Sequence, residues 1–262
     1  MSREQRRVQL APAYILHHHP YRDTSRILEV LSRDHGRITL FARGVRGPKA
    51  KLAAALQPFQ PLLVSWSGRG EAAQLTGAEI AGARAPVPAA KLMAAFYCNE
   101  LLLKLTTRHD PLPGLFDSYH RALAALRAEQ APEPGLRLFE KRLLETLGYG
   151  LELTVEARTG RRIEPHAYYH FRPAQGLFPT VAEAAGAIAG SSLEALAGET
   201  LADERALEDA RRLLKAALAE CLEGRELATR AVARAIVRRE SGSRTSLPES
   251  YGACAEPFTP EK

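Results

Sequence analysis

The first 80 residues carry short, partly alternating apolar runs that are typical of β-strands. Five runs are expected to form strands: residues 8–17, 27–31, 38–42, 62–66 and 73–80. The turn Asp34-His35-Gly36 separates the second run from the third and predicts a hairpin. Residues 51–56 (KLAAAL) are expected to form a short helix that ends before Pro58. Three strands, a short helix and two further strands are the layout of an OB-fold, a five-stranded barrel.

The pattern changes after a stretch of small residues and prolines at 83–90, which we interpret as a linker. Apolar residues then recur at helical spacing, which predicts helices at 91–107, 115–126, 136–147, 204–222 and 226–239. Gly148 is expected to close the third of these as a C-cap, and a β-hairpin is expected around 168–171 and 176–178. The predicted fold class is therefore α+β. An N-terminal OB-fold β-barrel at 1–82 and the linker 83–90 precede a mostly α-helical C-terminal domain with a small β-hairpin insertion at 91–240, and a mobile tail at 241–262.

The bulk composition is that of a soluble globular protein, with 45% hydrophobic and 25% charged residues among 262. No apolar run approaches the roughly 18 residues that span a bilayer, and no signal-peptide core follows the basic N-terminus. The expected compartment is therefore the cytoplasm. Cys98, Cys221 and Cys254 lie far apart, so neither a disulfide framework nor a CxxC zinc knuckle is indicated.

The charge is distributed unevenly along the chain. Residues 1–82 hold 12 of the 36 Lys/Arg and 6 of the 30 Asp/Glu, so the remainder holds 24 of each and is neutral. Between His35 and Gly70 there is no acidic residue. A basic surface without counter-charges suggests a polyanionic partner such as a nucleic acid. The alternative is a solvated basic face that serves solubility.

Candidate nucleic-acid contacts cluster in and around the loop that follows the predicted hairpin. Gly44 and Gly47 would let the backbone approach a phosphate closely. Aromatic rings nearby could stack on bases. We interpret Phe41 and Phe59 as barrel core, and we regard Trp66 as the better stacking candidate because polar and turn residues surround it. The predicted DNA-binding residues are Arg22, Arg26, Arg37, Arg43, Arg46, Lys49, Lys51, Trp66 and Arg69.

A second basic feature lies on the last predicted helix. Arg230, Arg234 and Arg238 recur every four residues and form one stripe, with Arg225 near the start of the helix. Like charges at this spacing favour an anionic partner, which could be phosphate or an acidic peptide. The alternative is that the stripe is only solvated and that nearby acidic residues serve as its counter-charges.

Catalytic and metal-binding patterns have little support. His17, His18 and His19 alternate sides if they continue a strand, so they cannot readily hold one ion. His166 and His170 fit a half-exposed hairpin better than a ligand pair. No Walker loop, dinucleotide-binding glycine motif, GxSxG or HExxH is present. Nothing assembles a nucleophile, a base and an oxyanion site, so no enzymatic activity is expected.

The N-terminal segments YRDTSRILEVLSRDHGRITLFARGVRG and LQPFQPLLVSWSGRGEAAQLTGAE closely resemble the RecO family of bacterial DNA-repair and recombination-mediator proteins. The later segments LFEKRLLETLGYG and ELATRAVARAIVRR resemble the family's helical domain and last helix. The resemblance implies a non-catalytic protein at the nucleoid that binds single- and double-stranded DNA and anneals complementary strands. It also implies contacts with RecR and with the acidic C-terminal tail of the single-strand-binding protein, so that RecA can load onto DNA.

Many members of that family carry a four-cysteine zinc site just after the segment that matches LGYG. Residues 151–166 contain no cysteine here, so we expect no zinc site, no cofactor and a segment held by packing alone. Two other classes remain open. An RNA-binding OB-fold protein, such as a translation or ribosome-assembly factor, fits the same fold and charge. A metal-dependent hydrolase that uses the histidines would require bound metal.

Overall fold

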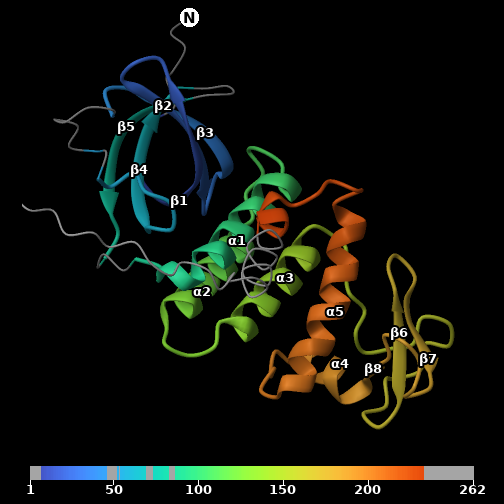
Figure 1. The fold of residues 1–262 in the computed structure, drawn as a ribbon. Coiled ribbons are helices and arrows are strands. Elements are labelled where there is room, and N and C mark those ends of the chain that lie inside the picture. The colour runs from blue at the N-terminus through green and yellow to red at the C-terminus, as the bar shows by residue number, and fades with distance from the viewer. Residues whose placement is uncertain (1–6, 46–51, 53, 69–72, 83–85, 233–262) are drawn as a thin grey trace, which may run out of the picture.

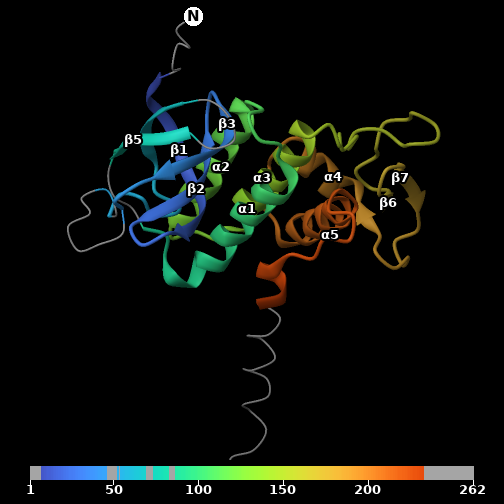
Figure 2. The same ribbon diagram turned by 90° about the horizontal axis from the view of Figure 1, so that it is seen from above.

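A computed structural model of the chain describes residues 7–45, 52, 54–68, 73–82 and 86–232. A β-barrel lies at one end of the molecule, a group of helices follows, and a small sheet lies at the other end (Figure 1). The view from above shows the same sequence of barrel, helices and sheet (Figure 2).

The barrel closes through five strands in the order β1-β2-β3-β5-β4. These are β1 (Arg7–Tyr21), β2 (Ser25–Ser32), β3 (Gly36–Ala42), β4 (Leu62–Ser67) and β5 (Ala73–Ile80). All pairs are antiparallel except β3 with β5, which closes the barrel in parallel through Leu40 and Ala73. The predicted N-terminal OB-type barrel is thus confirmed.

Strand β1 is longer than its pattern predicts. It continues through the three histidines to Tyr21, because each of these residues pairs with β2, from His17 opposite Glu29 to Tyr21 opposite Ser25. A register shift between Ile15 and His17 marks a bulge. Cross-strand pairing therefore extends a strand into residues that have little strand propensity of their own.

Alternation along the strands divides their side chains between two cores. Ile15, Val30 and Leu40 point into the barrel. On the opposite face of β1 and β2, Tyr14, Leu16 and Leu31 pack against the helices. The barrel and the helical part thus share one continuous apolar interface rather than being joined only by a linker.

The helical part contains a short 3-10 turn, η1 (Ala89–Lys91), and the helices α1 (Leu92–Leu105), α2 (Pro113–Arg127), α3 (Glu133–Thr146), α4 (Gly190–Ala197) and α5 (Glu204–Cys221). Four of the five predicted helices correspond to α1, α2, α3 and α5. Gly148 ends α3 as predicted: its φ is +80°, and the N–H of Tyr149 donates to the carbonyl of Leu144 at 3.0 Å.

The predicted hairpin is also present, as β6 (Tyr168–Arg172) and β7 (Gly176–Thr180). A third strand that the sequence does not indicate, β8 (Ile188–Ala189), pairs with β6. It has only two residues and leads into α4, so it leaves no periodic signal. Gly190 is required there because a Cβ would lie 1.9 Å from the carbonyl oxygen of Glu164.

Two predicted helices differ in the structure. Within 51–56, the described residues form a turn, in which the N–H groups of Ala55 and Leu56 both donate to the carbonyl of Leu52. The last helix starts at residue 228 rather than 226. Its first N–H groups, from Ala228 and Thr229, donate to the carboxylate of Glu100 on α1 at 2.7 and 3.0 Å. The cap therefore comes from another helix, where a local pattern cannot reveal it.

Polar contacts reinforce the junction between barrel and helices. Asn99 of α1 donates to the carbonyl of Leu16 at 2.8 Å, and the Tyr14 hydroxyl lies 2.6 Å from Nδ1 of His120. Gly36 lies so close to Asp110 that an added Cβ would be 2.0 Å from that residue's carbonyl oxygen. Within the predicted linker, Val87 is buried in the shared core. These contacts fix the barrel to α1 and α2.

Candidate nucleic-acid interface

Two aromatic rings meet where the β1–β2 turn and the end of β3 lie together. The ring centroids of Tyr21 and Phe41 are 4.7 Å apart, with the rings nearly perpendicular at 76°. Both side chains are half-buried. Phe41 faces outward because its neighbours Leu40 and Ala42 face the barrel core. The prediction that Phe41 belongs to the barrel core is therefore wrong, and these rings form what we call the Tyr21–Phe41 pair.

One arginine flanks each ring of the Tyr21–Phe41 pair. The guanidinium carbon of Arg22 lies 5.3 Å from the centre of the Tyr21 ring, and that of Arg43 lies 5.9 Å from the Phe41 ring. Both arginines are exposed. The rings border a hollow of about 590 Å³, lined by Tyr21, Arg22, Asp23, Thr24, Ser25, Phe41 and Arg43. Asp23 is the single acidic side chain of that lining.

The turn that carries Arg22 has an uncommon backbone conformation. Arg22 has a φ of +52°, a region that residues other than glycine enter rarely and at a cost of about 1–3 kcal/mol. This conformation places a guanidinium beside the Tyr21 ring. Local strain of this kind is concentrated at functional sites in proteins.

The predicted basic loop starts at this same end of the barrel. Gly44 has a φ of +64° and open space around it, and Val45 is buried in the barrel core. On the far side of the loop, Leu52 packs against that core. Arg46, Lys49 and Lys51, like Arg69 of the β4–β5 turn, lie outside the described residues, so their DNA contacts stay predictions.

Arg26 lies deeper than an open phosphate contact requires. It shares a strand face with Leu28 and pairs with Ala42 of β3, and its Nη1 atom is buried without a hydrogen-bond partner.

Burial, followed by the charge of Arg26, lowers the pKa of nearby His18. Burial and then His19 lower the pKa of His17 as well. Within the described parts of the chain, no group of three metal-binding side chains exists.

Arg37 has its partners within the protein. Its guanidinium lies 3.1 Å from the carboxylate of Glu29 and donates to the carbonyl of Thr106 at 2.8 Å. Only 14% of its side chain is exposed. Arg108 binds the other oxygen of Glu29 at 2.6 Å. The structure thus assigns Arg37 to the junction with α1 and not to an open DNA-binding face.

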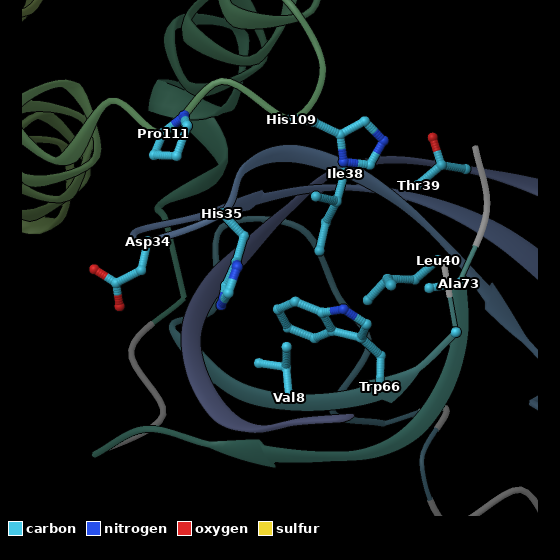
Figure 3. Close-up of a pocket in the computed structure, with 11 residues that line it drawn as sticks. Val8, Asp34, His35, Ile38, Thr39, Leu40, Trp66, Ala73, His109 and Pro111 are labelled. Carbon is cyan, nitrogen blue, oxygen red and sulfur yellow. The ribbon is translucent and has the colours of Figure 1, made fainter. Parts of the chain in front are cut away.

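Trp66 also lies inside the protein. It shares the inner face of β4 with Val64, is 6% exposed, and meets the His35 ring edge to face at 5.0 Å. It lines a cavity of about 360 Å³ at the mouth of the barrel, together with Val8, His35, Leu40 and other side chains (Figure 3). Polar neighbours in sequence suggest an exposed ring, but they occupy the outer strand face. Trp66 therefore does not offer an open ring face for a base.

The predicted arginine stripe is only partly described. Arg225 donates to the carbonyls of Cys221, Leu222 and Lys104 and so closes the end of α5. Arg230 lies over the Tyr97 ring at 5.6 Å. Arg234 and Arg238 lie outside the described residues.

Phe59, predicted as core, is indeed buried, but in the core shared with the helices.

Comparison with known proteins accounts for nearly the whole described chain. The family model for the Recombination protein O N-terminal region matches residues 8–84, and the model for its C-terminal region matches residues 89–231. The chain belongs to the RecO family. The family boundaries fall between β5 and η1, where the barrel ends and the helices begin.

Named relatives of this RecO-family chain are DNA repair proteins. The chain is 45% identical to the DNA repair protein RecO of Methylococcus capsulatus, over 86% of its own length and 92% of the relative. It is 43% identical to that of Nitrosococcus oceani, over 91% and 98% of the two chains. A relative from Alkalilimnicola ehrlichii is 41% identical over 94% and 98%.

Residues 151–166, considered above for a zinc site, carry apolar packing and backbone contacts. Residues 151–166 contain no cysteine. Leu153 and Ile163 are buried instead, and Val155 and Arg162 form an isolated antiparallel bridge. The N–H of Ile163 donates to the carbonyl of Thr154 at 2.9 Å. These residues do not fit a four-thiolate zinc site.

Among the described helices, none is long and apolar enough to cross a membrane.

Proposed function

We propose that this RecO-family chain is a non-catalytic recombination mediator that binds single- and double-stranded DNA and anneals complementary strands. The observation that carries the proposal is the barrel end where Arg22 and Arg43 flank the Tyr21–Phe41 pair. Cations attract the phosphate backbone, and exposed rings accept bases. An OB-type barrel is a common carrier of such a surface.

The charge pattern supports the same partner. The run from His35 to Gly70 contains six cations and no acidic residue, whereas residues 83–262 are neutral overall. Contacts of this kind release counterions from DNA, so binding should weaken steeply with salt. They read no base edges, so binding should tolerate any sequence.

The partner proteins belong to the same proposal. We infer that the chain acts with RecR to load RecA onto DNA coated by the single-strand-binding protein, and that it contacts the acidic tail of that protein. The guanidinium of Arg225 is committed to the end of α5, so we leave it out of that contact. Arg230, Arg234 and Arg238 remain the proposed anion-binding stripe.

The direct test reverses the charge of the loop. We expect Arg43→Glu, Arg46→Glu, Lys49→Glu and Lys51→Glu together to abolish DNA binding and annealing, because four attractive phosphate contacts become repulsive. A matched control reverses four exposed cations that lie outside the barrel: Arg158, Arg161, Arg162 and Lys215. Binding is measured by fluorescence anisotropy, and folding by circular dichroism.

Three outcomes are informative. Loss of binding only in the loop variant supports the proposal. Equal affinity in a folded loop variant would contradict it. Competition with a matched RNA strand separates the alternative, because an RNA-binding OB-fold protein would release DNA at a lower concentration of RNA than of unlabelled DNA.

A further inference from the structure

The Tyr21–Phe41 pair plays no part in either hydrophobic core. One core fills the barrel and the other joins the barrel to the helices, and neither ring belongs to them. The contrast with Phe59 and Trp66 is clear, since both of those rings are buried at 7% and 6% exposure. Two adjacent half-exposed aromatic side chains that stabilise no core require another explanation.

The contact between the two rings covers only part of their faces. The rings meet edge to face at 76°, so the edge of one ring covers only one face of the other. The hollow beside them, of about 590 Å³, has the size of a small-ligand site. Its remaining lining comes from Asp23, Thr24 and Ser25, whose side chains are short and polar, so a flat group could reach the rings without a large side chain in the way.

The surroundings of the pair favour a ligand that is flat and anionic at once. Arg22 and Arg43 lie on either side, each within 6 Å of a ring centre. Arg22 has a φ of +52°, which is uncommon for a residue other than glycine, and Gly44, next to Arg43, has a φ of +64°, which glycine adopts readily. A nucleotide of a single strand combines a planar base with a phosphate on each side.

We propose that the Tyr21–Phe41 pair is a base-stacking platform that holds an unpaired base, while Arg22 and Arg43 contact the phosphates next to it. This inference rests on the proposed DNA-binding function. It also explains why the protein would prefer single-stranded to double-stranded DNA: a base inside a duplex is stacked on its neighbours and cannot reach the pair. The platform therefore favours single-stranded over double-stranded DNA.

The test compares variants of the rings on probes that differ only in their bases. Phe41→Leu keeps an apolar side chain but removes the aromatic face, and Tyr21→Ala removes the second ring. We expect each to weaken binding to an adenine-rich single strand roughly 5- to 150-fold, the range for removal of one base–aromatic stack. Binding to a duplex of the same sequence and to an abasic strand of equal length should not change.

A matched control uses the same chemistry elsewhere in the molecule. Tyr168 begins β6 of the small sheet, which lies far from the barrel (Figure 1), and its side chain is half-buried. The guanidinium carbon of Arg205 on α5 lies 5.4 Å from the centre of the Tyr168 ring. Tyr168→Ala should bind every probe like the original protein. Thermal unfolding of all variants, followed by circular dichroism, verifies that they fold.

The results separate this inference from the proposed function. Unchanged single-strand affinity in folded Phe41→Leu and Tyr21→Ala would overturn the platform and leave DNA binding intact. An equal loss on strand, duplex and abasic probe would also overturn it, since the rings would then only support the phosphate contacts. An original protein that binds no probe would overturn the proposed function itself.

Discussion

At the scale of single residues, the arginines in and next to the barrel have two different roles. Arg37 and Arg108 neutralise the buried carboxylate of Glu29, which also accepts from the Thr39 hydroxyl at 2.8 Å. Arg22 and Arg43 are exposed beside aromatic rings instead. Equal charges in the sequence therefore differ in the structure, because the strand face and the burial of its surroundings decide how far a guanidinium is exposed.

The Glu29 cluster should contribute strongly to stability. We expect Glu29→Ala to lower the free energy of unfolding by about 2–4 kcal/mol, because it leaves the nearly buried Arg37 without its counter-charge. The half-exposed side chain of Arg108 keeps the loss below that of a fully buried network. Urea unfolding followed by circular dichroism measures the change.

An exposed ion pair between the same two parts of the molecule gives the comparison. Arg33 and Asp117 are 3.0 Å apart, with side chains 47% and 43% exposed. Asp117→Ala should cost less than about 1 kcal/mol, since solvent screens such a pair. Equal losses in the two variants would argue against the structural role assigned to the Glu29 cluster.

At the scale of elements, the sequence predicts helices and strands that have periodic apolar positions. It does not predict elements whose bounds are set by contacts with residues far away in the sequence. Periodic apolar positions are sufficient for the barrel strands, for α1, α2, α3 and α5, and for the β6–β7 hairpin. They cannot place β8, whose two residues are defined by pairing with β6, or the start of the last helix, which Glu100 caps across the fold.

The same reasoning explains the mixed result for the candidate site. Arg22 and Arg43 follow from charge and turn residues that are visible in the sequence. Arg46, Lys49, Lys51 and Arg69 lie outside the described residues, so their DNA contacts stay predictions. The predictions place Trp66 and Phe41 on the wrong strand faces. The period of two along a strand would have given the right ones, because Trp66 lies two residues from the core residue Val64 and Phe41 lies next to the core residue Leu40. The Arg37–Glu29 pair connects neighbouring strands, and only the register of β2 with β3 brings them together.

The segment 151–166 should keep its structure without metal. Leu153 and Ile163 are buried there, and the N–H of Ala157 donates to the carbonyl of Leu177 at 2.8 Å, so apolar packing and backbone hydrogen bonds stabilise this segment. We expect the purified protein to contain no stoichiometric zinc by mass spectrometry. A chelator should leave its thermal unfolding midpoint unchanged. A midpoint that falls on chelation would show a structural metal and contradict this account.

At the scale of the whole molecule, a basic barrel end is fixed to a neutral helical body. The two share a core that includes Tyr14, Leu16 and Phe59 from the barrel side and Phe116 and Tyr119 from α2. Asn99 connects them by accepting from Tyr119 and donating to Leu16. A DNA strand at the barrel end and a partner protein on the helices would therefore hold a constant spacing.

The most direct test of the central claim, that this barrel end binds the nucleic-acid backbone, is the salt dependence of single-strand affinity. For an unstructured oligonucleotide of mixed sequence, the logarithm of the binding constant should fall linearly with the logarithm of salt concentration. Replacing Arg22 and Arg43 by Ala should reduce the slope by about 0.7 for each phosphate interaction that the substitution removes. A slope that is unchanged in the double variant, or an affinity of the original protein that does not vary with salt, would contradict the account.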